Sequence, residues 1–298
     1  MKQTKEKVIR IASKYELRLK EEPISFNQSG LDFLVVMAED HHGDKWILRI
    51  PRREDVTSGI QKEKAILEVV KPNVNFQVPN WEVENHELIA YKALTGVPAA
   101  TVNQEKQQYD WVMDPEHISE TFTNSLAKVM TSLHQIPLSK VEEQGLEVKT
   151  IGQVRSEMET RMQHAKAEFG VSDHLWKRWQ NWLHNDSIWP DHTSFTHGDL
   201  HAGHILINEK ESVTGLIDWT EAKVADVSND FAGHLKTHGS QELGKLINAY
   251  ERAGGRVWPK MKEHIIELTA TYPVDIADFA LKSNIDEYKQ MAKQSLNS

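Results

Sequence analysis

The sequence contains no cysteine among its 298 residues. This absence excludes disulfide bonds, thiolate zinc sites, iron–sulfur clusters and cysteine nucleophiles. No apolar run approaches the roughly 18 residues that a membrane-spanning helix needs. The charged N-terminal stretch also lacks the apolar core of a signal peptide. We therefore expect a soluble, cytoplasmic protein with no membrane partner.

Three common enzyme motifs are missing as well. The sequence has no G-x-x-x-x-G-K-S/T, no G-x-G-x-x-G and no G-x-S-x-G, so it is not an ordinary P-loop enzyme and lacks the Rossmann and α/β-hydrolase signatures. Its formal net charge of −9 argues against a general nucleic-acid binder, because such proteins need a basic face. Nine tryptophans, in contrast, supply material for a packed core.

The first third of the chain predicts strands with one main helix. Two β-rich runs, 31–40 and 45–51, flank the polar turn HHGD and predict a hairpin. Apolar residues at helical spacing predict the main helix at 57–70, and residues 6–20 can form another. Residues 87–94 predict a further strand that ends at the breaker cluster TGVP.

The rest of the chain predicts mostly helices. Apolar residues at helical spacing place them at 118–133, 151–168, 173–184 and 261–272. Two short strands, 204–208 and 213–219, lie between them. The sequence therefore predicts an α+β protein, with a small β-rich lobe at 1–93, a linker near 93–97 and a helical lobe at 94–298.

The segment HGDLHAGH, residues 197–204, concentrates three histidines and one aspartate. One hypothesis is a zinc site, because imidazole suits zinc. Helical zinc motifs place two histidines four residues apart on one face, but Gly198 and Gly203 disfavour a helix here. The sequence also lacks H-E-x-x-H, so a zinc hydrolase is kept only as an alternative.

The spacing of two aspartates favours phosphoryl transfer instead. Asp199 is followed five residues later by His204 and nineteen residues later by Asp218, at the end of an apolar strand. A kinase catalytic loop places its base a few residues before one metal ligand, and a second metal-binding Asp follows on a later strand turn. Asp199 would then orient the attacking hydroxyl, and His204 and Asp218 would hold Mg²⁺ at the nucleotide phosphates. The alternative for each lone Asp is a turn or cap residue.

The segments FTHGDLHAGHILIN, GLIDWTEAKVADVSNDFA and KWILRIPRRE resemble the macrolide 2′-phosphotransferase branch of the aminoglycoside phosphotransferase-like kinases. The resemblance covers most of the chain. It implies a protein-kinase-like fold with a small N-terminal β-sheet lobe, containing one main helix, and a large helical C-terminal lobe. It also implies Mg²⁺ and a GTP-preferring transfer of the γ-phosphoryl group to the desosamine 2′-hydroxyl of macrolides such as erythromycin. ATP is the alternative donor, and we expect a monomer.

The resemblance also assigns roles to residues of the loop. It puts Asp199 at the catalytic base position, and Asp218 and His204 at the metal positions. His204 stands where most relatives carry Asn, and imidazole is a poor match for Mg²⁺, which prefers oxygen. His197 is implied to anchor the loop, and His201 is interpreted as structural.

Candidates for nucleotide binding lie in the small lobe, and they are Ser29, Gly30, Arg49, Glu63 and Ala93. Ser29 and Gly30 stand where kinases lay a loop over the phosphates. Arg49 falls at the strand position where kinases usually carry Lys, with Lys45 as the alternative. Glu63 fits the helix glutamate that pairs with this cation, and Ala93 belongs to the expected hinge that reads the base.

Candidates for substrate contact are His197, Asp230, Phe231 and Tyr272. A macrolide is large and mostly apolar, so an apolar groove is expected. Asp226 and Asp230 match the Asp-x-x-x-Asp of the family, where the default role is to cap the next helix. Asp230 is also a candidate for contact with the dimethylammonium group of the substrate, and the alternative for Phe231 and Tyr272 is a place in the core.

Two further hypotheses remain. One is a kinase of the same fold that acts on an aminoglycoside or another small alcohol, for which the segment DIADFALKSNIDE offers carboxylates. The other is a nucleotide-binding pseudokinase, against which the presence of both Asp199 and Asp218 argues.

Overall fold

The structure is a computed structural model that describes residues 4–27, 32–53, 56–103 and 108–297. Its residues form two compact units. Unit 1 consists of Met1–Met113 and Ala202–Thr220, and unit 2 consists of Asp114–His201 and Glu221–Ser298. These bounds differ from the lobes expected at 1–93 and 94–298, because a later piece of the chain returns to unit 1.

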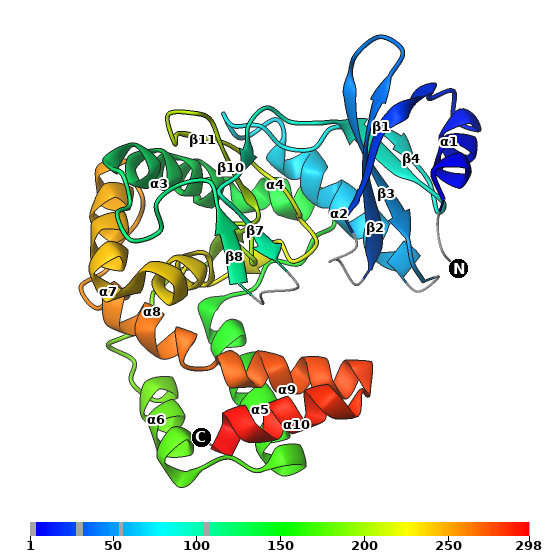
Figure 1. The fold of residues 1–298 in the computed structure, drawn as a ribbon. Helices are drawn as coiled ribbons and strands as arrows, with labels where there is room; N and C mark the ends of the chain where they lie inside the picture. The colour runs from blue at the N-terminus through cyan, green and yellow to red at the C-terminus, as the bar shows by residue number, and fades with distance from the viewer. Residues whose placement is uncertain (1–3, 28–31, 54–55, 104–107, 298) are drawn as a thin grey trace. The chain divides into compact units, whose positions relative to one another are not determined.

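Unit 1 is built on a five-stranded antiparallel sheet (Figure 1). Its strands, in spatial order, are β1 (Leu19–Asn27), β2 (Phe33–Asp40), β3 (Lys45–Pro51), β5 (Ile89–Lys92) and β4 (Trp81–Glu84). The predicted hairpin is confirmed, and its register sets Val35 opposite Arg49. The Asp40 carboxylate holds the turn, because it accepts hydrogen bonds from the His42 and Asp44 amides and from the Trp46 indole.

A helix covers each face of this sheet. Because successive side chains of a strand point to opposite faces, each face has its own set of side chains for a helix to pack against. On one face, Val8 and Ile11 of α1 (Lys5–Ser13) join a core that includes Val36 and Leu48. On the other face, Ile60 of α2 (Thr57–Val70) packs with a second cluster, which contains Phe33, Ile89 and Tyr91. The helix predicted at 57–70 is confirmed.

The helix predicted at 6–20 is too long. It ends at Ser13, and β1 begins at Leu19. Glu16 adopts a left-handed conformation with φ of 64°, which a helix interior does not accommodate. The strand that follows was missed because its polar residues do not keep a clean alternation.

Smaller strands complete unit 1. A three-stranded sheet contains β6 (Val97–Pro98), β10 (Ile205–Ile207) and β11 (Val213–Leu216), and a hairpin contains β7 (Ala100–Asn103) and β8 (Gln108–Trp111). The strands predicted at 204–208 and 213–219 are therefore confirmed, with shorter bounds.

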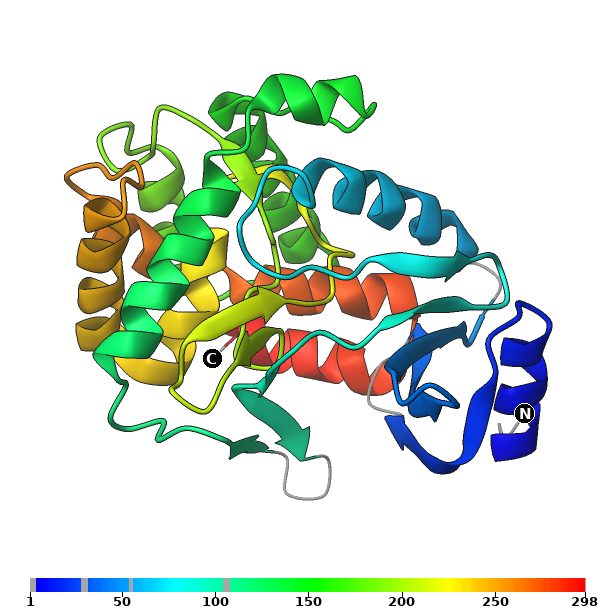
Figure 2. The same ribbon diagram turned by 90° about the horizontal axis from the view of Figure 1, so that it is seen from above.

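Unit 2 is mostly helical. Its helices are α3 (Glu120–His134), α4 (Leu138–Glu143), α5 (Ile151–Phe169), α6 (Asp173–Leu183), α7 (Asn229–Arg252), α8 (Met261–Thr269), α9 (Tyr272–Ser283) and α10 (Asp286–Asn297). A two-stranded sheet pairs β9 (Ser194–Thr196) with β12 (Lys223–Ala225). The helices α9 and α10 run side by side (Figures 1 and 2). Together with unit 1, this unit confirms the α+β class.

The predicted helices of unit 2 match the structure to within a few residues, with one division. The stretch predicted at 261–272 ends at Thr269, and α9 starts separately at Tyr272. Helix α7 contains a break at Gly239, where φ is 79° and ψ is 179°. In the described part of the chain, no helix is both long and apolar enough to cross a membrane.

Candidate active site

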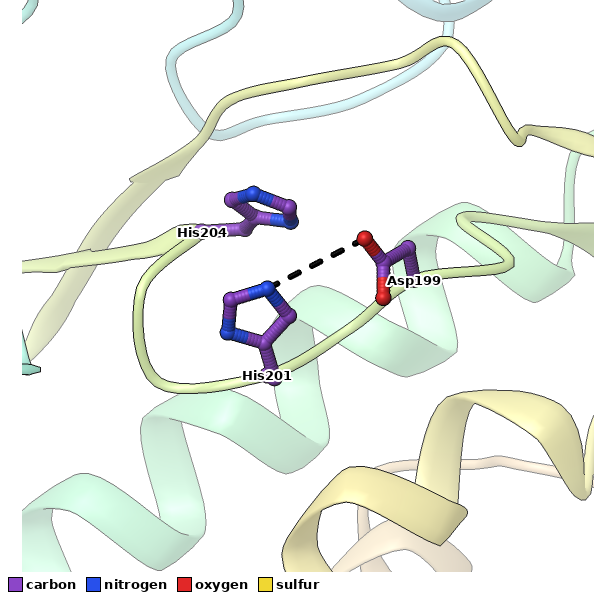
Figure 3. Close-up of side chains that lie close together, drawn as sticks. All are labelled: Asp199, His201 and His204. Atoms are coloured by element: carbon purple, nitrogen blue, oxygen red, sulfur yellow. Dashed lines mark ion pairs between the residues drawn. The ribbon is translucent and has the colours of Figure 1, made fainter. Parts of the chain in front are cut away.

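The loop of residues 197–204 joins β9 to β10 and passes from unit 2 to unit 1 after His201. In unit 2, the Asp199 side chain is 52% exposed, and its Oδ2 lies 3.8 Å from Nε2 of His201. Figure 3 shows this ion pair on the loop, with His204 the next histidine along the chain. The Asp199 carboxylate is therefore accessible from solvent.

Asp230 fixes the backbone that leads into Asp199. Its Oδ2 accepts a hydrogen bond from the His197 amide at 2.8 Å, and its Oδ1 accepts one from the Gly198 amide at 2.8 Å. Burial opposes ionisation of Asp230, but the hydrogen bond and charge of His134 hold the pKa of this carboxyl below its ordinary value. An ionised, buried acceptor of this kind restrains the loop strongly.

His134 and Tyr250 extend this restraint into the helices. Nε2 of His134 lies 3.0 Å from Oδ2 of Asp230, and Nδ1 of His134 lies 2.9 Å from the Tyr250 hydroxyl. Neither residue was a candidate from the sequence. His134 is 96 residues away from Asp230 and 116 residues away from Tyr250 in the sequence. No local sequence pattern signals a pairing over such separations.

Two glycines allow close packing around the same half of the loop. A Cβ at Gly198, where φ is 81°, would lie 2.4 Å from the Glu221 carbonyl oxygen. A Cβ at Gly233 of α7 would lie 2.3 Å from the Leu200 carbonyl oxygen. Both distances are too short for any side chain, so the loop packs directly against the neighbouring backbone.

His204 and Asp218 lie together in unit 1. Nε2 of His204 is 3.7 Å from Oδ2 of Asp218, whose side chain is 43% exposed. Asp218 follows β11 and has a left-handed φ of 63°. The Thr220 hydroxyl donates a hydrogen bond of 2.8 Å to its Oδ1. The pair thus offers one carboxylate and one imidazole to a ligand.

Arg49 and Glu63 form a buried ion pair in the same unit. The Nη1–Oε1 distance is 2.5 Å, and the two side chains are 8% and 1% exposed. Burial disfavours the charge of Arg49, but the Glu63 carboxylate keeps the pKa of this guanidinium above its ordinary value, and Asp218 adds to the effect. The structure therefore brings together Arg49 and Glu63, whereas Lys45 is exposed.

The structure gives less information about the other candidates for nucleotide binding. The Ala93 amide donates a hydrogen bond to the Lys45 carbonyl oxygen at 2.8 Å, as the chain leaves β5. Ser29 and Gly30 lie outside the described residues.

Three of the four substrate candidates are buried. His197 and Phe231 have no exposed surface, and Asp230 is 1% exposed. Direct substrate contact does not fit this burial, because their side chains are enclosed by the protein. Tyr272, in contrast, is 49% exposed at the start of α9.

Asp226 is structural, but it does not cap the next helix as expected, because the N-cap of α7 is Ser228 and has no side-chain capping hydrogen bond. Asp226 belongs to a network apart from Asp230. Its Oδ1 accepts a hydrogen bond from the Ser228 amide just before α7, and its Oδ2 lies 2.5 Å from Nε2 of His264. The Trp182 indole donates to Nδ1 of His264, so the imidazole proton is on Nε2 and faces Asp226. This network ties the start of α7 to α6 and α8.

Comparisons with known proteins agree on one family. The model of the phosphotransferase enzyme family matches residues 23–264. A solved structure of macrolide 2′-phosphotransferase type I has a TM-score of 0.90 and 39% identity, over 98% of this chain and 96% of that chain. Macrolide 2′-phosphotransferase MphH from Brachybacterium faecium has a TM-score of 0.90 and 32% identity, over 97% of both chains. The uncharacterised protein YcbJ of Bacillus subtilis (strain 168) is 41% identical over 99% of this chain and 96% of its own length.

Proposed function

Since the chain belongs to the phosphotransferase enzyme family, we propose that it transfers the γ-phosphoryl group of GTP to the desosamine 2′-hydroxyl of macrolide antibiotics and so inactivates them. That it is a kinase acting on a hydroxyl group follows from the family itself. The observation that carries the finer proposal is the nearly full-length similarity, at 39% identity, to a macrolide 2′-phosphotransferase. The proposed place of action is the cytoplasm, and the proposed form is a monomer.

Asp199 is the proposed base of this reaction. Its exposed carboxylate would accept a hydrogen bond from the acceptor hydroxyl and orient the oxygen for attack. A bond forms between that oxygen and the γ-phosphorus, and the bond from the γ-phosphorus to the β–γ bridging oxygen breaks. The nucleoside diphosphate leaves, and the hydroxyl proton passes to Asp199.

The residues at the metal positions fit Mg²⁺ in part. Mg²⁺ usually keeps several waters and uses one or two protein carboxylates, and the half-exposed Asp218 supplies one. His204 is a weaker match for so hard a cation, so we assign it to a metal-bound water or a phosphate oxygen. When bound, Mg²⁺ would neutralise charge on the phosphates.

Arg49 is the proposed phosphate-binding cation of unit 1. Its ion pair with Glu63 holds it in place. The Asp218 carboxylate favours the charged form of Arg49 and so contributes to its raised pKa, which supports this assignment. The amide of Ala93 is engaged by Lys45, so Ala93 is a candidate for base contact only through its carbonyl oxygen. GTP remains the proposed donor, with ATP as the alternative.

A substrate panel tests the proposal. Purified enzyme is incubated with labelled GTP or ATP and with macrolides, aminoglycosides or no acceptor, and labelled products are identified by mass spectrometry. We expect phosphorylated macrolides, faster with GTP, and resistance to macrolides in a susceptible host that expresses the enzyme. Asp199→Asn should remove both effects while leaving the fold intact. Phosphorylation of aminoglycosides but not macrolides would refute the proposed substrate.

A further inference from the structure

Lys236 lies on the face of α7 that packs against the loop of residues 197–204. It follows Gly233 by three residues, and residues at this spacing are neighbours on a helix surface. A Cβ at Gly233 would lie 2.3 Å from the Leu200 carbonyl oxygen and 3.3 Å from Cα of His201. This face of α7 therefore touches the backbone directly after Asp199, and Lys236 projects from it.

The ammonium group of Lys236 has a defined position. Its Nζ lies 3.4 Å from the centroid of the Tyr272 ring, a cation–π contact. Desolvation lowers the pKa of Lys236, while the carboxylates of Asp275 and Asp199 act in the opposite direction. Asp275 forms an ion pair with Arg161, in which Oδ1 of Asp275 lies 2.5 Å from Nη2 of Arg161. The side chain still reaches solvent, so a ligand can meet the ammonium.

A cation at this place complements the reaction at Asp199. The carboxylate that orients the acceptor hydroxyl carries negative charge and repels the incoming phosphoryl group, whose own charge is spread over three oxygens. A positive charge near Asp199 offsets this repulsion. The flexible four-carbon stem of lysine lets its ammonium follow the phosphoryl group from donor to acceptor.

We propose that Lys236 is a catalytic residue of unit 2 that binds the transferred phosphoryl group, with its ammonium held in position by the Tyr272 ring. The proposal rests on the proposed function only in that Asp199 orients the acceptor. It does not depend on the acceptor being a macrolide, because the bound chemical group is the phosphoryl group itself.

Two substitutions separate charge from packing. Lys236→Met keeps the length of the side chain and removes its charge, whereas Lys236→Arg keeps the charge. We expect Lys236→Met to lower kcat about 10- to 100-fold, since a charge-stabilising group is lost from a partly solvated site. The KM values for nucleotide and acceptor should change less than about 3-fold, because the interaction is strongest in the transition state. Lys236→Arg should restore most of kcat.

The control is Lys245→Met on the same helix. Lys245 is exposed and pairs with Glu242 beyond the break at Gly239. The kcat of the Lys245→Met variant should therefore stay within about 2-fold of the wild-type value. Thermal melting is measured for all three variants. Equal losses of kcat in Lys236→Met and Lys236→Arg, with lowered melting temperatures, would show a structural role and overturn the proposal.

Hydrolysis of the nucleotide without an acceptor provides the second readout, because water then receives the same phosphoryl group. Lys236→Met should slow this reaction as well. Unchanged hydrolysis in Lys236→Met would overturn the phosphoryl-binding role, even if transfer to an acceptor were slowed. If the wild-type enzyme phosphorylates no macrolide, the proposed substrate fails, while the hydrolysis rates still decide the role of Lys236.

Discussion

Asp218 meets two separate requirements at one position. Its φ of 63° places the backbone in the left-handed region, which Asp and Asn tolerate better than most residues with a Cβ. Its half-exposed carboxylate is the oxygen ligand proposed for the metal. The left-handed backbone requires a residue type that tolerates positive φ, and the proposed binding of the metal requires the negative charge of the carboxylate.

Two substitutions at this residue separate these requirements. Asp218→Asn should leave the free energy of unfolding within about 0.5 kcal/mol of the wild-type value, because Asn accepts the same φ. Asp218→Ala should cost about 1 kcal/mol, because Ala does not. Both should lose phosphoryl transfer, at least 100-fold in kcat, since neither supplies a carboxylate. Urea unfolding and steady-state kinetics check this; turnover near the wild-type rate in Asp218→Asn would contradict the metal assignment.

The candidate site residues were assigned from local signals. Asp199, His204 and Asp218 were proposed from short spacings in one stretch of sequence, and Arg49 and Glu63 from their places on a predicted strand and helix. The ion pair of Arg49 with Glu63 agrees with that prediction. The role of Asp230 was harder to predict, because its partner His134 is 96 residues away and burial is not visible in a sequence.

At the scale of elements, α7 supports the loop. Its first turns supply Asp230, whose carboxylate holds the His197 and Gly198 amides, and Gly233, which lets the helix touch the Leu200 carbonyl oxygen. This arrangement demands a small residue at 233 for packing and not for backbone conformation, since no positive φ is found there.

Gly233→Ala tests that support. The added methyl group would meet a backbone oxygen at 2.3 Å, so the helix and the loop must separate. We expect kcat to fall about 10-fold or more, as misplaced catalytic groups lose near-attack geometry. Gly244→Ala, also in α7, is the matched control. Its Cβ would meet only the Nζ of Lys262 at 3.5 Å, and stability should rise by about 0.4–1 kcal/mol. Equal kinetics in the two variants would remove the case for close packing.

Helical periods predicted α2, α3, α5, α6 and α8, and several of the elements that they missed have physical causes. The helix at 57–70 was found because an apolar stripe defines it and Pro72 follows. A helix was expected after Asp226 and Asp230, but the extent of α7 was not predicted, because the break at Gly239 interrupts its pattern. The start of β1 was assigned to a helix, since the left-handed Glu16 leaves no signal in the sequence.

At the scale of the whole molecule, buried carboxylates link stability to pH. Asp226 has no exposed surface, and although burial opposes its charge, His264 holds its pKa below the ordinary value. A group with a depressed pKa in the folded state stabilises the protein above its unfolded-state pKa, near 3.9. That contribution is lost as the pH falls below about 4 and through the folded-state pKa.

Asp226→Asn should reveal this linkage. At pH 7 the variant should be less stable than the wild type by about 2–4 kcal/mol, because it loses a buried charged hydrogen-bond acceptor. The difference should shrink as the pH falls from 4 towards 3, because the carboxyl of the unfolded wild-type chain then takes up a proton. Urea unfolding at several pH values measures it, and a constant difference across this range would show that the Asp226 charge does not stabilise the fold.

The two units also show why the extent of the lobes could not be predicted from composition. Residues 202–220 lie between the two pieces of unit 2 in the sequence, yet they belong to unit 1. They do so because β10 pairs with β6, and the Ala99 amide donates to the Ile205 carbonyl oxygen. Such pairings join strands that are about a hundred residues apart. A prediction that follows the order of the sequence therefore assigns β10 and β11 to the same lobe as the helices on either side of them.

The left-handed backbone at Asp218 has a consequence for descent. A lineage released from selection for catalysis can replace this aspartate by asparagine in one step and keep its fold, whereas replacement by most other residues strains the turn. Among relatives of this chain, asparagine at the position should therefore mark inherited inactivity, and aspartate should mark an enzyme still under selection to transfer phosphate.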